Sequence, residues 1–195
     1  MQPAEIRSIT ESMARRAPQW RSRIVIAAVV AAVSFPLTSA AFAASWFVIY
    51  AGLQLVERHL HPEGALAQRL SPQRYIAACL AIIFFNNVVF SAYGVAEIMS
   101  GSMLGLFCGA MVVGGVVINA VMMSPGSRTM VVVALAPQGL YLLLLPYGAL
   151  QAGLSTFDTV QLTFAAGMLV IAGLSIRSQI SRLFAQMQDA RAQAE

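Results

Sequence analysis

A run of 33 residues without a charged side chain, from Ile24 to Val56, constrains this chain more than any other feature. As a single α-helix the run would be about 50 Å long, whereas the hydrocarbon core of a bilayer is about 30 Å thick. The run must therefore fold back on itself, and Pro36 and Thr38 near its middle are residues typical of turns. We predict a hairpin of two short membrane spans, over residues 22–37 and 40–57.

Further apolar runs follow a polar loop at residues 57–74. Composition places the chain among membrane proteins, since 58% of its residues are apolar and 10% are charged, against about 25% charged in an ordinary soluble domain. Soluble enzymes, disordered chains and secreted disulfide scaffolds have different compositions. We predict an all-α membrane protein with six transmembrane helices, the last four at 75–94, 101–123, 129–149 and 157–176.

The basic residues segregate with the predicted spans. All twelve are Arg, and with six spans they fall on the same side of the membrane: eleven in residues 1–22, 58–74, 124–128 and 177–195, and Arg23 at the start of the first predicted span. Because cytoplasmic loops are enriched in basic residues, we expect both termini in the cytoplasm and the chain in the bacterial inner membrane. The charges lie in separate loops rather than in one basic patch, so we expect no nucleic-acid partner.

The chain is thus expected to divide into an Arg-rich cytoplasmic segment (1–23), a six-span domain (24–176) and a C-terminal segment (177–195). In the first segment Ile6 and Met13 belong to a series of apolar residues at near-helical spacing. This pattern fits a short helix at the membrane interface, and a frayed tail is the equal alternative.

A signal peptide is the rival interpretation of the N-terminal region. Arg21, Arg23 and the residues Ala41–Ala43 imitate its basic start and its cleavage site. Cleavage after Ala43 would leave only Ala44–Val56 before the next charges, which is too short to cross a bilayer. We therefore expect the uncleaved hairpin.

Amide side chains lie within the predicted spans, where a buried amide is costly unless it is hydrogen-bonded. These residues form a candidate polar intramembrane cluster: Asn86, Asn87, Asn119 and Gln138. The cluster either joins helices or lines a small ligand site. No ionisable residue is predicted deep in a span, which disfavours an ion-coupled transporter. We find no catalytic, metal-binding or cofactor motif, and we expect no cofactor.

Two further patterns concern helix packing. Gly101, Gly105 and Gly109 recur every four residues, which favours close approach of helices within one chain or between two. Most of the Trp and Tyr residues, including Trp46 and Tyr93, fall near predicted span ends, as in an interfacial aromatic belt.

The segment after the sixth span carries a heptad pattern. Apolar residues recur at alternating spacings of four and three, which predicts a cytoplasmic coiled-coil helix and a homodimer. The predicted seam is Ile176, Ile180, Leu183 and Met187, continuing through Ala190 and Ala194. The same spacing continues upward into the membrane through Gly173 and Leu169. An amphipathic helix lying on the membrane surface is the alternative.

Residues Ser181 to Glu195 resemble the signalling helix that joins a membrane sensor to the phosphoacceptor domain of bacterial sensor histidine kinases, often hybrid ones. The resemblance implies a membrane-embedded input module that contacts the lipid bilayer and controls a cytoplasmic output domain in cis. It carries over no catalytic residue. Two alternatives stay open: the sensor of a diguanylate cyclase, and a six-span transport or scaffold protein complete in itself.

Overall fold

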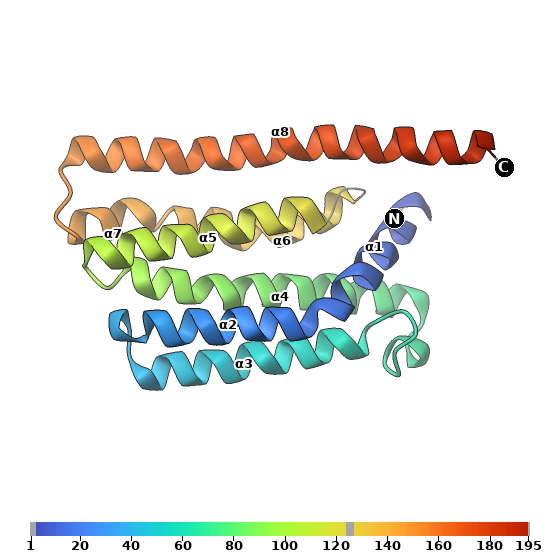
Figure 1. Cartoon of the computed structure of the whole chain (residues 1–195), viewed down its shortest axis with the longest axis horizontal. Helices are drawn as coiled ribbons and strands as arrows, with labels where there is room; N and C mark the ends of the chain where they lie inside the picture. Colours follow the sequence, from blue (N-terminus) through green and yellow to red (C-terminus); the bar gives the residue numbers. More distant parts are fainter. Residues whose placement is uncertain (1–2, 124–126, 195) are drawn as a thin grey trace.

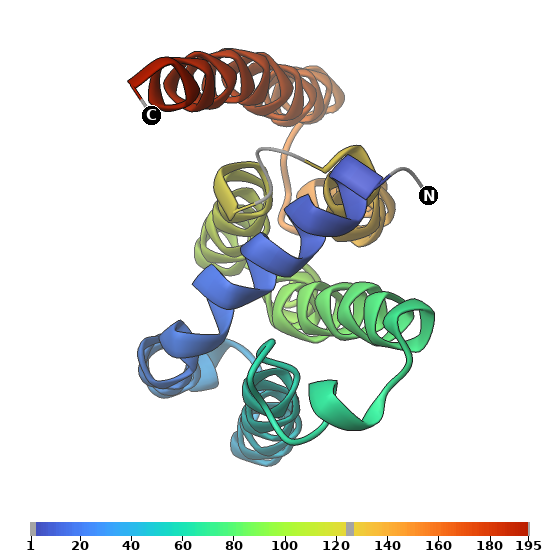
Figure 2. The ribbon, with the colours of Figure 1, turned by 90° about the vertical axis from the view of Figure 1, so that its right-hand side faces the viewer.

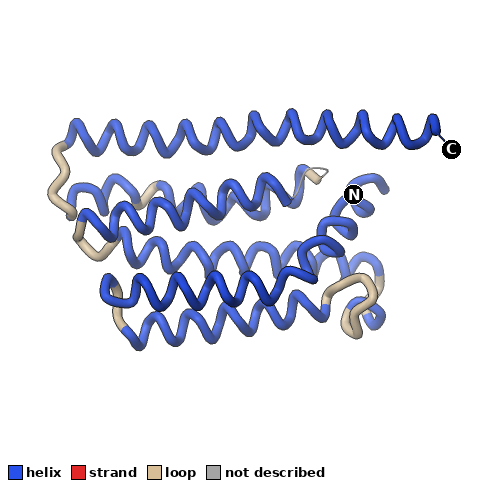
Figure 3. The backbone as a smooth tube through the Cα atoms, viewed as in Figure 1, coloured by secondary structure: helices blue, strands red, loops and turns tan. Residues whose placement is uncertain are grey.

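The computed structural model describes residues 3–123 and 127–194. Side chains are described from Glu5 onward and, beyond Ile176, at positions 178, 179, 182, 183 and 186. The described residues form helices joined by short turns, and they contain no strand (Figure 3). The α-helices are α1 (Pro3–Arg16), α2 (Trp20–Ser34), α3 (Ala40–His59), α4 (Pro72–Ile98), α5 (Met103–Met123), α6 (Arg128–Leu142), α7 (Leu145–Gln151) and α8 (Thr156–Ala194).

The predicted number of spans is confirmed. Six helical segments of the described chain are long and apolar enough to cross a membrane, the first formed by α1 with α2 and the fifth by α6 with α7. The long uncharged run folds back where the sequence predicts. A short 3₁₀ turn at Phe35–Leu37 ends α2, and the hydroxyl of Ser39 begins α3 by accepting a hydrogen bond from the backbone N–H of Phe42 at 3.2 Å.

The antiparallel helices give the bundle two ends at which the turns and termini gather (Figure 1). Helix α1, the loop between α3 and α4, the start of α6 and the C-terminal part of α8 gather at one end, called here the Arg-rich end. Eight of the twelve Arg residues belong to these segments, and the other four lie in the adjoining helix turns: Arg21 and Arg23 at the start of α2, Arg58 at the end of α3 and Arg74 at the start of α4. The turns α2–α3, α4–α5 and α7–α8 lie at the opposite end. The segregation of charge expected from the sequence is therefore present in the fold.

Helix α4 occupies the centre of the bundle and packs on α3, α5 and α6 (Figure 2). Helix α2 packs on α3 at one edge, and α8 packs on α5 and α7 at the other. The share of the apolar window buried inside the protein is 44% for α4 and for α5 but 11% for α8. Helix α8 is therefore a peripheral helix attached along one face.

The glycine pattern serves packing within the chain. A Cβ atom built on Gly94 of α4 would lie 2.9 Å from the carbonyl oxygen of Gly109 of α5, and one on Gly109 would clash with the carbonyl of Gly94. Such close approach maximises van der Waals contact between helices. The sequence left open whether these glycines pack within one chain or between two chains. Gly109 packs within its own chain.

Three aromatic residues of α3 and α4 pack inside the protein. Trp46, Tyr50 and Tyr93 are each at most 5% exposed and form one cluster between the two helices. Trp46 and Tyr50 stack with ring centroids 5.7 Å apart, and the indole Nε1 of Trp46 donates to the carbonyl of Val89 at 2.5 Å. An interfacial belt was the wrong prediction for these three, because a helix partner covers the rings that the sequence alone leaves at span ends.

Helix α1 crosses the Arg-rich end of the bundle (Figure 2). Ile9 and Met13 are fully buried and join the core formed with Tyr75 of α4. Glu5 accepts a hydrogen bond from the backbone N–H of Thr129 at 3.2 Å, which ties α1 to the start of α6. The N-terminal segment is therefore a docked helix rather than a frayed tail, and its apolar face contacts protein.

The membrane part of the predicted seam is used inside the monomer. Leu162 and Ala166 of α8 pack on the core formed by α4, α5 and α7. A Cβ atom on Gly173 would lie 3.5 Å from a methyl group of Val121 on α5. Beyond the membrane part, Ile176 and Leu183 are 51% and 58% exposed. The seam is thus packed on the bundle at Leu162, Ala166 and Gly173 and exposed at Ile176 and Leu183.

Candidate functional site

Glu57 is the main polar residue that the sequence misplaced. Its charge put it in the predicted loop 57–74, whereas α3 continues through it to His59 and buries its side chain completely. A buried carboxylate requires cationic partners and hydrogen-bond donors. The residues around it supply both.

Two arginines converge on Glu57. Arg16, at the end of α1, places Nε 3.1 Å from Oε1. Arg23, in the first turn of α2, donates from Nη1 to Oε2 and from Nη2 to Oε1, each at 2.9 Å. The 3₁₀ turn with Pro18 between α1 and α2 sets the angle at which the two arginines meet. Nη2 of Arg23 also donates to the carbonyl of Arg16 at 2.5 Å, which fixes that turn.

Amides complete the arrangement. Asn86 of α4 donates from Nδ2 to Oε2 of Glu57, and its Oδ1 accepts from Nε2 of Gln54 at 2.9 Å. Gln54 lies one helical turn before Glu57 on α3, so the same helix face carries both. Five side chains from α1, α2, α3 and α4 therefore form one network, which we call the ion cluster: Arg16, Arg23, Gln54, Glu57 and Asn86.

The candidate cluster expected from the sequence is divided between three places. Asn86 belongs to the ion cluster. Gln138 of α6 instead accepts a hydrogen bond from Ser91 at 2.7 Å and donates to the backbone carbonyl of Asn87 at 3.5 Å, so it joins α6 to α4. Asn119 is exposed on α5. The four residues therefore do not share one hydrogen-bonded network.

A cleft of about 480 Å³ adjoins the ion cluster. It separates α2 from α5, and α4 forms its floor. Its volume falls within the range of about 300–1,000 Å³ that is typical of small-molecule sites. The lining comprises Arg16, Gln19, Ser22, Arg23, Ile26 and Val30 from the α1–α2 side, Tyr50 from α3, Asn86, Asn87 and Phe90 from α4, and Met111, Val112, Gly115, Val116 and Asn119 from α5. Three of the four predicted cluster residues thus meet here.

The charge of the cleft is positive at one end. Arg16 and Arg23 both line it, and none of the lining residues that the structure describes is acidic. The one carboxylate that compensates them, Glu57, lies behind them and is completely buried. Two guanidinium groups therefore face one carboxylate, which leaves a net positive charge beside the cleft.

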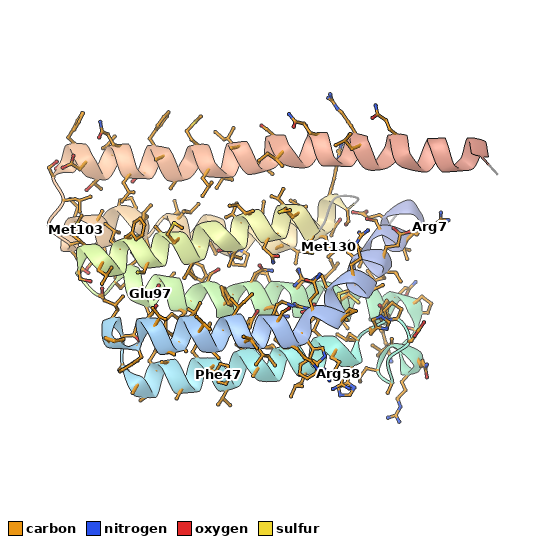
Figure 4. All side chains as sticks on the ribbon, viewed as in Figure 1. Arg7, Phe47, Arg58, Glu97, Met103 and Met130 are labelled. Carbon is orange, nitrogen blue, oxygen red and sulfur yellow. The ribbon has the colours of Figure 1, made fainter. Side chains whose placement is uncertain are left out.

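A second buried carboxylate lies far from the cluster. Figure 4 shows Glu97 at the other end of the bundle from Arg7 and Arg58. The sequence placed it in an outer turn, but α4 extends to Ile98 and buries its side chain completely. Neither carboxylate oxygen forms a hydrogen bond with another described residue in the geometry of the structure, although the side chains of Ser34 at the end of α2 and Tyr93 of α4 lie close enough to interact with it.

Two of the four side chains of the predicted coiled-coil seam are described. Ile176 and Leu183 are exposed, and the side chains of Ile180 and Met187 lie outside the described residues.

Among the described residues no three His, Cys, Asp or Glu side chains lie close enough together to hold a metal ion. Comparison with protein families, curated proteins and solved structures finds no match to this chain.

Proposed function

We propose that this chain is the membrane-embedded input module of a two-component sensor histidine kinase, which relays a signal through α8 into a dimeric coiled coil. The continuity of α8 carries the proposal. This helix runs without a break from Thr156 to Ala194, and its apolar window ends near Ile176. The 18 residues beyond that point extend it by about 27 Å. A rigid helix of this length moves its far end whenever its membrane part shifts.

The packing of α8 suits a moving element. It contacts the bundle along one face, through α5 and α7, and is far less buried than the central helices. Gly114 and Gly173 lie in its contact with α5, where small residues permit sliding of one helix over another. A small translation or rotation of α8 therefore changes few side-chain contacts.

Helix α5 connects the cleft to α8. Met111, Gly115 and Asn119 line the cleft, whereas Val117 and Val121 on another face of the same helix contact α8 near Gly173. A change in the cleft that displaces α5 therefore also acts on α8 through this contact. The cleft and α8 are thus two distinct sites, and α5 is the physical connection between them that a relay requires.

The direction of the relay follows from the Arg-rich end. Basic residues favour the cytoplasmic side, so we assign this end, with both termini, to the cytoplasm of a bacterial inner membrane. The exposed Leu183 then lies where a second copy of α8 can cover it. A diguanylate cyclase would use the same helix, and the identity of the output domain separates the two alternatives.

The test is the dependence of output on helical phase. In a chimera that joins residue 195 to a histidine kinase domain of known activity, one residue inserted after Arg182 rotates the following helix by about 100°, and seven residues restore the seam. We expect the first insertion to change autophosphorylation several-fold and the second to preserve it. Equal output from both chimeras would reject the relay and favour a transport or scaffold protein.

A further inference from the structure

The cleft beside the ion cluster has a polarity gradient that runs the same way on three helices. On α2 its lining changes from Ser22 and Arg23 near the Arg-rich end to Ile26 and Val30 farther in. Along α5 the change is from Asn119 through Gly115 to Met111, toward the opposite end. A ligand that fits must be polar at one end and apolar along the rest.

Helix α4 shows the same order, from Asn86 and Asn87 to Phe90. From Gln19, just before α2, to Val30 within α2 the lining extends about 16 Å, at 1.5 Å per residue. That length suits an alkyl chain lying parallel to the helices. The cleft also opens sideways, since Ile26 and Met111, which line it, are 54% and 63% exposed. A molecule of the bilayer can therefore enter from the membrane.

The polar end of the cleft selects an anion. Arg16 is 4% exposed and held in place by Glu57, and the Nε atom of Arg23 is buried without a hydrogen-bond partner among the described residues. Since none of the described residues that line the cleft is acidic, the net positive charge is uncompensated on that side among them. Guanidinium groups bind phosphate oxygens through several parallel hydrogen bonds.

We propose that the cleft between α2 and α5 binds an anionic phospholipid, with its phosphate at Arg16 and Arg23 and one acyl chain between Ile26, Val30 and Met111. The second chain of a two-chain lipid remains in the bilayer. As the stimulus of an input module this lipid rests on the proposed function, because α5 would carry its effect to α8. Its binding is a property of the 195-residue chain and is measured without any output domain.

Gly115 offers a way to block the cleft without disturbing the fold. A Cβ atom built on it meets no other atom within 4 Å, and its side of α5 faces the cleft. Gly115→Leu therefore fills space that the acyl chain needs. Gly139→Leu is the matched control, because Gly139 is an exposed glycine of α6 with the same free space and does not line the cleft. Met111→Trp, one helical turn from Gly115, is a second blocking variant.

The experiment titrates the detergent-solubilised chain with palmitoyl-lysophosphatidylglycerol and measures binding by native mass spectrometry. The comparison probes are palmitoyl-lysophosphatidylcholine, which has no net charge, and inorganic phosphate, which has no chain. We expect one saturable site for the anionic lipid, at least ten-fold weaker binding of the zwitterionic lipid and no binding of phosphate. Gly115→Leu and Met111→Trp should weaken binding at least ten-fold, and Gly139→Leu should leave it unchanged.

The unfolding midpoint of each ligand-free variant shows whether it is folded, and the lipid should raise that midpoint for the wild type and for Gly139→Leu only. Equal binding of both lipids, binding of phosphate alone, or undiminished binding by both folded blocking variants would each overturn the proposal. Lipid binding together with phase-independent output would instead reject the signalling role and keep the lipid site.

Discussion

Arg23 and Glu57 lie 34 residues apart in sequence, yet two hydrogen bonds of 2.9 Å join them as a two-point ion pair. The pair closes the open end of the α2–α3 hairpin, whose other end is closed by the turn at Ser39. Because Arg16 and Asn86 meet the same carboxylate, one side chain holds α1, α2 and α4 to α3.

Glu57→Gln should destabilise the protein strongly. The substitution keeps the shape of the side chain but removes the charge that compensates Arg16 and Arg23, and leaving a buried charge without its partner costs about 3–5 kcal/mol. Thermal or denaturant unfolding in detergent measures the loss. Glu63→Gln, at an exposed glutamate in the following loop, is the control and should change stability by less than about 0.5 kcal/mol. Equal stability of both variants would show that the ion cluster does not hold the helices together.

Glu97→Gln, unlike Glu57→Gln, should not lower the free energy of unfolding. Since the carboxylate of Glu97 is fully buried without a hydrogen bond to another described residue, its charge is not stabilised by the fold. We expect the neutral amide to leave the free energy of unfolding unchanged or to raise it by up to about 3 kcal/mol. Glu11→Gln, at an exposed position of α1, provides the reference. A loss of more than about 1 kcal/mol would mean that the carboxylate has a cationic partner.

Glu57 and Glu97 also show which features of the fold can be predicted from the sequence and which cannot. The charge-free run from Ile24 to Val56 predicts the first hairpin, because bilayer thickness limits helix length whatever the tertiary structure. The same reliance on charge placed Glu57 and Glu97 in loops. Both lie in the last turn of a helix and are buried by contacts that no local pattern shows.

A signal for the ion cluster does exist in the sequence. Arg16 and Arg23 are seven residues apart, close to two helical turns, and Glu57 is the acidic residue that ends the next apolar run. What the sequence lacks is the angle between α1 and α2 at Pro18, which makes the two guanidinium groups converge. For the amides, Asn86 and Gln138 both lie on buried helix faces, but their partners depend on how α3 and α6 pack around α4.

The contact between α4 and α5 gives a matched pair of glycine substitutions. Gly109→Ala places a methyl group against the carbonyl of Gly94 and should lower the free energy of unfolding by about 1–3 kcal/mol, as overpacking does. Gly115→Ala meets free space on the same helix and should be neutral or slightly stabilising, because Ala favours the helix by about 1 kcal/mol over Gly. Similar losses in both variants would indicate a general intolerance of α5 to substitution.

Topology can be tested at turns that tolerate an insertion. Gly101 and Gly153, with φ of +70° and +85°, lie in turns at the opposite end of the bundle, and Gln68 lies in the loop at the Arg-rich end. Reporter fusions after Gly101 and after Gly153 should report outside the cytoplasm, and a fusion after Gln68 should report inside. An outside location for Gln68 would reverse the orientation that the proposed function requires.

The final prediction concerns the uncovered part of α8. Leu183 is 58% exposed in one chain, and covering a seam residue of this kind in a dimer contributes about 1.5–3 kcal/mol when burial is complete. In a background with Cys79 and Cys108 replaced by Ala, single cysteines on the predicted seam should crosslink between chains far faster than cysteines off the seam. The seam positions are Ile180, Leu183 and Met187, and the comparison positions are Ser178, Arg182 and Asp189.

The contrast between positions matters more than the yield at any one of them. A coiled coil brings seam side chains together and keeps neighbours on the outer face apart, so crosslinking should follow a spacing of three and four residues. A helix lying on the membrane surface meets another copy only by collision and should crosslink evenly at all six positions. Ala166→Cys, within the membrane part of α8, should stay uncrosslinked in either case, since Ala166 packs there against the core of its own chain.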